Sequence, residues 1–185
     1  LSELGLHLYK PDSGEIVLNY PWQHGGYRSL QPQVVEGDKI ILPTGPGSGT
    51  RLVQASLNNN SLQLEEKWTS LDMKADFNDI LILKDYIYGF DNNIFACISL
   101  ANGKRMWKGG RYGKGQAILL ADSDLIIVVS ERGDLVLLRA SPDKLQELAK
   151  IPAMEGKTWN HHVVVGNRLY VRTAAEAVWY QSDAV

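Results

Sequence analysis

Short apolar runs alternate with turn-forming clusters along the whole chain, and this pattern predicts strands joined by tight turns. The clearest unit begins at Asn78 and holds four runs, separated by Lys84-Asp85, Asp91-Asn92-Asn93 and Asn102-Gly103. Runs of β-branched and aromatic residues bounded by Asp, Asn and Gly are typical of strands in hairpins. Residues 78–115 are therefore predicted to form a four-stranded antiparallel meander, with strands a, b, c and d in chain order.

The same order of runs and turns recurs on both sides of this unit. Residues 31–77 and 116–159 also supply all four strands, residues 1–30 supply c and d, and residues 160–185 supply a, b and c. Four strands in about 40 to 45 residues is the spacing of β-propeller blades. The sequence therefore predicts an all-β fold, a β-propeller of four-stranded antiparallel blades, with about four blades and seventeen strands in one domain.

Two sets of markers keep the register of these units. Strand d ends in tryptophan in three of them, and the fourth has Leu148 or Ala149 instead; the tryptophans are Trp22, Trp68 and Trp107. A side-chain amide opens each strand a, seven or eight residues before the a–b turn, at Gln31, Asn78, Gln116 and Asn160. A stacked solenoid or a sandwich does not predict a tryptophan at the end of strand d, so the markers favour a propeller.

Composition excludes few functions. Hydrophobic residues make up 44% and charged residues 22% of the chain, as in globular proteins. A formal net charge of -2 gives no general attraction to nucleic acid or to an anionic membrane. No apolar run reaches the roughly 20 residues that span a bilayer. Cys97 is the single cysteine, so no intrachain disulfide is expected.

The units resemble the pyrroloquinoline-quinone-like (PQQ-like) propeller repeat. Its c–d signature is an apolar strand, Ala-Leu-Asp, a turn with Thr-Gly, and a strand ending in Trp; the matching stretches are residues 95–107 and residues 8–22. The likeness includes bacterial quinoprotein-like propellers related to the outer-membrane assembly lipoprotein BamB. It implies that Trp22, Trp68 and Trp107 dock between neighbouring blades and that the protein is periplasmic or otherwise extracytoplasmic.

The resemblance also bears on the extent of the propeller, because this family commonly has eight blades. With Leu1 as its first residue, the chain is expected to be a C-terminal portion, whose missing N-terminal blades or a second copy would complete the ring. The alternative is a closed four-bladed ring, in which residues 15–22 pair with residues 176–181.

Quinoprotein dehydrogenases resemble the same repeat, so an enzyme must be considered. Such an enzyme needs a base, oxygen ligands for calcium and a platform for PQQ. Many members carry a disulfide between adjacent cysteines, which Cys97 alone cannot form, and no Asp or Glu matches the base. We therefore predict no catalytic residue and no cofactor here; PQQ and calcium are expected only if the essential residues lie in a missing N-terminal half.

The four amides are the candidate binding residues. Strand a is the innermost strand of a blade, so Gln31, Asn78, Gln116 and Asn160 should ring one mouth of the central channel. Other polar and aromatic residues enrich this rim; they are His24, Tyr27, Arg28, Arg111, Tyr112, Lys114, Trp159 and His161. Such a ring could hold a peptide, a sugar or an anion. Alternatively, the amides satisfy backbone groups where the chain crosses between blades.

Three other motifs carry less weight. The glycine-rich stretch 109–115 lacks the spacing of a phosphate-binding loop, and the stretch 44–49 lies between two predicted strands and is interpreted as a long hairpin loop. His161 and His162 should point to opposite faces of a strand, which argues against a shared metal ion. A basic cluster between Lys104 and Lys114 is interpreted as a solvated edge or a contact for an anionic partner.

Together these features predict a noncatalytic binding or scaffolding module that presents its channel mouth and blade edges to a protein or peptide. Part of a PQQ-dependent oxidoreductase and a carbohydrate-binding propeller are the alternatives.

Overall fold

The computed structural model describes residues 1–23 and 28–182, and this part of the chain is all-β. It contains seventeen strands and one 3-10 turn, Ala121–Ser123, without an α-helix. No helix of the described part therefore has the length and apolar character needed to cross a membrane. The predicted fold class and strand number are confirmed.

The strands form five antiparallel meanders, here called blades 1 to 5, and neighbours in sequence are neighbours in each sheet. Blade 1 comprises β1 (Gly5–Tyr9) and β2 (Ile16–Pro21). Blade 2 comprises β3 (Gln33–Val35), β4 (Lys39–Pro43), β5 (Thr50–Asn58) and β6 (Ser61–Ser70). Blade 3 comprises β7 (Leu81–Leu83), β8 (Tyr86–Asp91), β9 (Ile94–Ser99) and β10 (Arg105–Lys108). Blade 4 comprises β11 (Gln116–Leu120), β12 (Leu125–Val129), β13 (Asp134–Arg139) and β14 (Gln146–Pro152). Blade 5 comprises β15 (Val163–Val165), β16 (Arg168–Arg172) and β17 (Ala177–Gln181).

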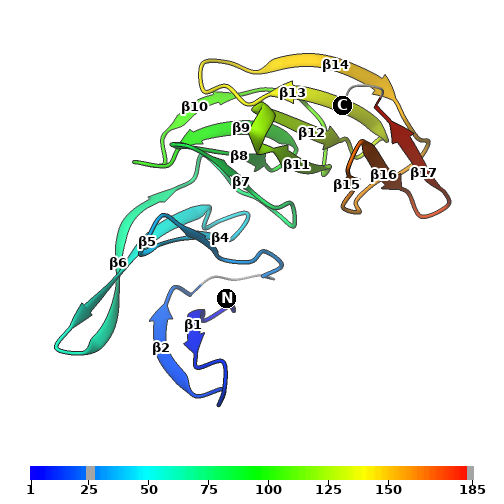
Figure 1. Cartoon of the computed structure of the whole chain (residues 1–185). Coiled ribbons are helices and arrows are strands. Elements are labelled where there is room, and N and C mark those ends of the chain that lie inside the picture. The colour runs from blue at the N-terminus through cyan, green and yellow to red at the C-terminus, as the bar shows by residue number, and fades with distance from the viewer. Residues whose placement is uncertain (24–27, 183–185) are drawn as a thin grey trace.

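The blades follow one another along an arc that leaves one side open, with blade 1 at one end and blade 5 at the other (Figure 1). Strands β2 and β17 lie in separate sheets and do not pair. The pairing of residues 15–22 with residues 176–181, which a closed four-bladed ring requires, is therefore absent from the structure.

The hydrophobic core lies between the blades, because each sheet packs a face against the next sheet. Four clusters of buried residues occupy these seams, and each draws on two consecutive blades. Ile41 and Ile98 are fully buried between blades 2 and 3, and Phe95 and Val136 between blades 3 and 4. The alternation of apolar and polar residues in the strands thus builds a core that is shared by neighbouring blades.

Two tryptophans dock on the following blade. The Trp68 indole donates from Nε1 to the Leu100 carbonyl oxygen of blade 3 at 3.0 Å, and the Trp107 indole donates to the Ser141 carbonyl oxygen of blade 4 at 2.8 Å. Gly103 lies under the Trp68 ring, where an added Cβ would come within 2.7 Å of Cε3. The glycine of the c–d turn therefore makes room for the tryptophan of the preceding blade.

Trp22 does not occupy the equivalent strand position, so its use as a register marker was wrong. The c–d turns of blades 1 and 3 are alike: Gly14 N donates to Lys10 O as Gly103 N donates to Ser99 O. The d strands that follow these turns, β2 and β10, also have a β-bulge at the same place. Alignment of the two strands from the turn therefore puts Leu18 at the position of Trp107. Trp22 follows β2.

Trp22 is nevertheless buried against blade 2, with Leu42 and Val53 in the same cluster. The Arg51 guanidinium lies 4.2 Å from the centre of its ring. In blade 4 the same bulge places Ala149, rather than Leu148, at the tryptophan position.

Candidate functional site

Strand pairing shows which residues are equivalent at the starts of the four a strands. In each blade, one residue of strand a pairs with the same position of strand b. These equivalent residues are Gln33, Leu81, Ile118 and Val163. Two residues before them stand Gln31, Asp79, Gln116 and His161. Asn78 and Asn160 come one residue earlier, before Asp79 and His161. The prediction that the four amides occupy equivalent positions is therefore wrong.

Two of the amides are buried and join consecutive blades. Asn78 is fully buried, and its Nδ2 donates to the Gly115 carbonyl oxygen. Gln116 is 2% exposed, and its Nε2 donates to the Trp159 carbonyl oxygen at 3.1 Å. Both amide nitrogens thus satisfy carbonyl groups at the crossover to the next blade.

The other two amides lie nearer the surface. Asn160 accepts a hydrogen bond on Oδ1 from Arg172 at 2.9 Å, and Gln31 is exposed. Gln33 instead donates to the Ile80 carbonyl oxygen at 2.9 Å, which joins blade 2 to blade 3. The structure therefore does not bring the four amides together as one ring of equivalent groups.

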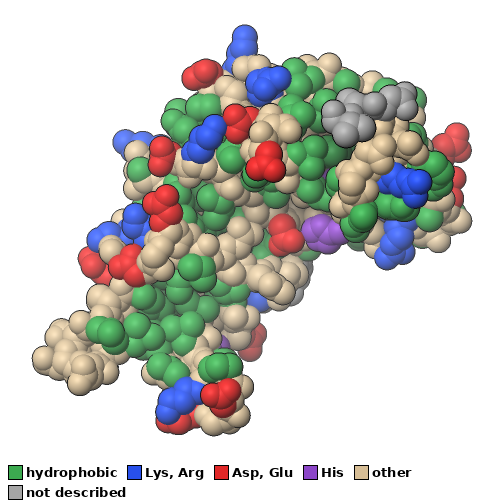
Figure 2. Space-filling view, viewed as in Figure 1, with side chains coloured by type: hydrophobic (Ala, Val, Ile, Leu, Met, Phe, Trp, Pro, Cys, Tyr) green, Lys and Arg blue, Asp and Glu red, His purple; other side chains and the backbone are tan. Residues whose placement is uncertain are grey.

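Aromatic and charged side chains from blades 3 and 5 meet on the concave side of the arc, here called the channel mouth. The rings of Phe77 and Trp159 lie 5.4 Å apart between centroids. Next to them, His161 Nε2 lies 3.6 Å from Asp79 Oδ2. Figure 2 shows this hollowed side, where histidine and acidic side chains come together. The mouth thus carries stacking surface, donors and acceptors from two non-consecutive blades.

Glu131 of blade 4 completes the mouth. Its carboxylate accepts from the Trp159 indole Nε1 at 2.9 Å and from the Lys114 backbone N–H at 3.2 Å. The hydrogen bond from Trp159, followed by that from Lys114, lowers the pKa of Glu131. The Lys157 ammonium lies 4.1 Å from the centre of the Trp159 ring. Trp159 itself is 41% exposed, so a ligand can reach it.

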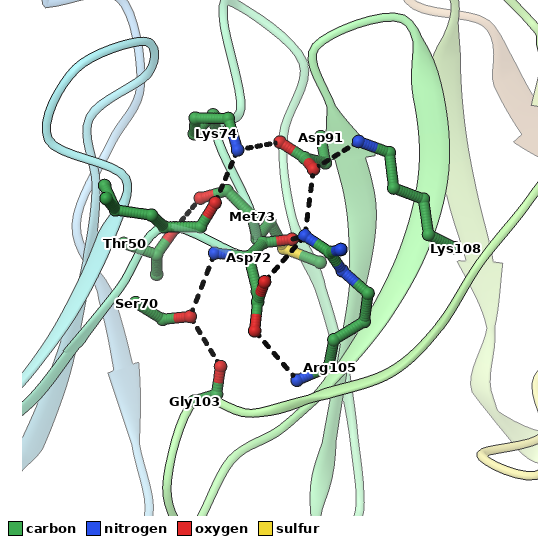
Figure 3. A network of polar contacts seen from close by, with 10 residues as sticks. Thr50, Ser70, Asp72, Met73, Lys74, Asp91, Gly103, Arg105 and Lys108 are labelled. Carbon is green, nitrogen blue, oxygen red and sulfur yellow. Dashed lines mark hydrogen bonds and ion pairs between the residues drawn. The ribbon is translucent and has the colours of Figure 1, made fainter.

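The connector from blade 2 to blade 3 is held by a charged network (Figure 3). Asp91 is fully buried and lies 2.7 Å from Lys74 and 2.5 Å from Lys108; Arg105 also contacts it and pairs with Asp72 at 2.6 Å. Burial opposes ionisation of Asp91, but the hydrogen bonds from Lys108 and Lys74 outweigh it and lower its pKa. This network fixes the connector that leads to Phe77.

Next to Phe77, a further ion pair joins the connectors before blades 3 and 4. Lys114, in the connector from blade 3 to blade 4, pairs with Asp76. The Lys114 ammonium also lies 5.7 Å from the centre of the Phe77 ring. The side chains before strands β7 and β11 are thereby positioned together at the mouth.

Arg111 lines a separate cleft of about 420 Å³ between blades 3 and 4. Arg132 and Lys150 line the same cleft, together with Glu131 and Asp134. Glu131 therefore belongs to both the mouth and the cleft, which places the two next to each other. Arg111 was expected at the rim, and the structure places it in this adjoining cleft.

Some sequence candidates have other surroundings. Arg28 donates to the carbonyl oxygens of Ser2, Thr44 and Trp22, so it ties blade 1 to blade 2. His24 and Tyr27 lie outside the described residues. His162 is 3% exposed while the His161 side chain is half exposed, and no group of three metal-ligating side chains occurs within residues 1–23 and 28–182.

Phe77, Asp79, Glu131 and Arg132 were not singled out from the sequence. Phe77 and Asp79 flank Asn78, so the chosen marker was one residue from both. Glu131 and Arg132 lie in the b–c turn of blade 4, and a search limited to the starts of strand a could not find them.

The meanders arranged along an arc, with indoles docked between sheets, define the architecture of a β-propeller built from antiparallel blades. Comparison of the sequence with protein-family models and with curated proteins gives no match. Among solved structures, the chain is similar to BamB from Moraxella catarrhalis, with a TM-score of 0.51 and 15% identity. That alignment covers 96% of this chain and 64% of the BamB chain.

A second similar structure is the computationally designed Ika8 protein, with a TM-score of 0.54 and 7% identity. The alignment covers 97% of this chain and 66% of the designed chain. The chain thus spans slightly less than two thirds of either structure. At these identities the likeness shows a shared fold.

Proposed function

We propose that this chain is a noncatalytic propeller module that binds a protein or peptide at the channel mouth. The observation that carries the proposal is the meeting of Phe77 and Trp159, at 5.4 Å, beside the pair formed by Asp79 and His161. An exposed indole flanked by charges of both signs offers stacking area and hydrogen bonding together, as the central residues of protein interfaces do.

Ion pairs and hydrogen bonds hold the residues of this site in place, which favours a preformed surface. Lys74, Lys108 and Arg105 hold the connector through Asp91, and Glu131 orients the Trp159 indole. Fixed side chains lose little conformational entropy when a ligand binds, which favours affinity. The extracytoplasmic location implied by the PQQ-like resemblance stays a prediction.

A binding assay with two matched tryptophan variants tests the proposal. Whole protein is applied to an array of varied dodecapeptides, and binding is compared for wild type, Trp159→Ala and Trp179→Ala. Trp159 lies at the mouth, whereas Trp179 lies on the outer strand β17 and is 56% exposed. Peptide binding should fall at least about tenfold in Trp159→Ala and persist in Trp179→Ala, because loss of an aromatic contact at an interface centre commonly costs 2 kcal/mol or more.

The alternatives give different outcomes in parallel assays. Binding confined to a glycan array and lost in Trp159→Ala would support a carbohydrate-binding propeller, which the exposed indole also suits. Binding of PQQ in the presence of calcium, followed by dye reduction, would support an oxidoreductase. Equal loss of peptide binding in both tryptophan variants would contradict a site at the mouth.

A further inference from the structure

The cleft beside the channel mouth has a rigid backbone. It is lined by the b–c turn of blade 3, by the connector to blade 4 and by the b–c turn of blade 4. The Gly113 N–H donates to the Asn93 carbonyl oxygen at 3.2 Å, and the Glu131 N–H donates to the Tyr112 carbonyl oxygen at 2.8 Å. These bonds fix the backbone next to Arg111 and Arg132.

Side-chain contacts of the lining residues add to this rigidity. Tyr112 is 4% exposed, and its hydroxyl contacts Glu147 Oε2 at 2.8 Å. Gly113 approaches Glu131 so closely that an added Cβ would lie 2.5 Å from Oε2. The connector that carries Arg111 is therefore held from three directions.

The carboxylates of the cleft are already engaged by other groups. Asp134 pairs with Lys150 at 3.0 Å and contacts the Ser130 hydroxyl at 3.1 Å. Glu131 accepts from Trp159 and Lys114. Across residues 1–23 and 28–182, no ion pair joins Arg111 or Arg132 to an acidic residue. Two guanidinium groups thus line the cleft without forming an ion pair to either of its carboxylates.

We propose that this cleft binds the carboxylate of an acidic residue in the peptide partner, an inference that rests on the proposed function. Guanidinium groups present paired N–H donors that match the two oxygens of a carboxylate. Glu131 and Asp134 in the same walls repel a polyanion but accept N–H groups of a peptide. A single acidic side chain within a peptide fits these mixed charges.

The position of Glu131 connects the two parts of the surface. Because it lines the cleft and holds Trp159, a peptide with its acidic residue at Arg111 and Arg132 would place neighbouring residues at the aromatic pair. The structure therefore assigns the acidic preference to the cleft and the apolar contact to the mouth.

The experiment uses an array of dodecapeptides that each carry Glu at the sixth position beside a twin with Gln there. Wild type is compared with the double variant Arg111→Gln with Arg132→Gln. The matched control is Arg139→Gln with Lys144→Gln, which removes the same charge from exposed positions near the c–d turn of blade 4. We expect wild type and control to prefer Glu peptides about tenfold or more, and the cleft variant to lose this preference, since hydrogen bonds to charged groups contribute this much.

The outcomes separate the two proposals. Peptide binding that requires Trp159 but does not depend on the Glu of the peptide or on Arg111 and Arg132 would overturn the carboxylate site. The proposed peptide-binding function would then still hold. An equal loss in the cleft variant and the control would also overturn it, because a general charge effect would then explain the data. Displacement of Glu peptides by inorganic phosphate from wild type but not from the cleft variant would support the arginine site. Absence of any peptide binding would overturn both proposals.

Discussion

The seam between blades 3 and 4 and the seam between blades 4 and 5 join the same kind of sheet by different means. At the first, Trp107 docks on Ser141 beside buried Phe95 and Tyr112. At the second, Ala149 stands at the tryptophan position, and a groove of about 540 Å³ runs along the junction. The difference teaches that an indole can be absent from a seam when other contacts hold the two sheets.

Polar groups supply those contacts between blades 4 and 5. His162 is buried, and its Nε2 lies 3.1 Å from the Ile127 carbonyl oxygen. Tyr180 donates from its hydroxyl to the Ala153 carbonyl oxygen at 2.7 Å, and Gln116 donates to Trp159. A seam that depends on such groups should respond to pH, whereas one filled by aromatic rings should respond to loss of buried area.

The largest expected effect follows from removing the indole of the aromatic seam. Trp107→Ala should lower the free energy of unfolding by about 3 kcal/mol, because it deletes a docked ring and leaves the Ser141 carbonyl without its donor. Urea unfolding followed by circular dichroism measures this loss. The control is Trp179→Ala, whose ring is 56% exposed and should contribute less than about 0.5 kcal/mol. Equal losses in the two variants would show that seam docking is not what stabilises the fold.

A smaller effect is expected from acid at the seam between blades 4 and 5. Burial, more than the nearby charge of His161, lowers the pKa of His162 to about 4 from an ordinary 6.5. The unfolded chain therefore takes up a proton at a higher pH than the folded one, and stability falls as pH drops from 6.5 towards 4. At pH 5 the loss should be about 2 kcal/mol relative to pH 7.

His162→Gln should remove this dependence between pH 7 and pH 5, which urea unfolding at the two values measures. The charged network around Asp91 should not contribute in this window. Its lowered pKa gives stability that is present above the ordinary value of 3.8 and lost only as pH falls below it. A His162→Gln variant that keeps the full pH dependence would place the acid-sensitive group elsewhere.

The sequence predicted the blades because their signals are local. Turn clusters such as Asn102-Gly103 and the strands beside them lie within a few residues of one another, and their hydrogen bonds follow. Trp22 was assigned to the wrong strand position because the spacing between tryptophans includes loops of unequal length. The register of two strands is set instead by the turn that joins them. Counting from Gly14, as from Gly103, would have identified Leu18.

The channel mouth could not be predicted in the same way. Phe77 and Trp159 are 82 residues apart in sequence, and so are Asp79 and His161. Their contacts depend on the angle between blades, which is set by the packing of whole sheets. The amide of Asn78 was correctly placed at a crossover, but its burial and its bond to Gly115 emerge only once blades 3 and 4 are packed.

The smallest effect on stability is expected from substitution of the glycine in the c–d turn. Gly103 and Gly14 occupy the same turn of blades 3 and 1 with the same φ of 70°, yet an added Cβ would meet Trp68 at Gly103 and nothing within 4 Å at Gly14. Gly14→Ala should therefore cost about 1 kcal/mol for backbone conformation alone. Gly103→Ala should cost about 1 kcal/mol more than that, because the methyl group displaces the docked indole.

A double-mutant cycle isolates that difference. In a Trp68→Ala background the part of the extra cost of Gly103→Ala that comes from the indole should vanish, which leaves the backbone cost seen at Gly14 and the approach of the methyl group to Ser70 Cβ at 2.9 Å. Urea unfolding of the four proteins gives the coupling energy between the two positions. If Gly103→Ala costs the same with and without the indole, the glycine serves the turn alone. If the coupling is found, glycine and tryptophan act as one docking unit, and a seam that lacks the tryptophan, such as the one at Ala149, is free of the steric demand that the indole places on the next turn.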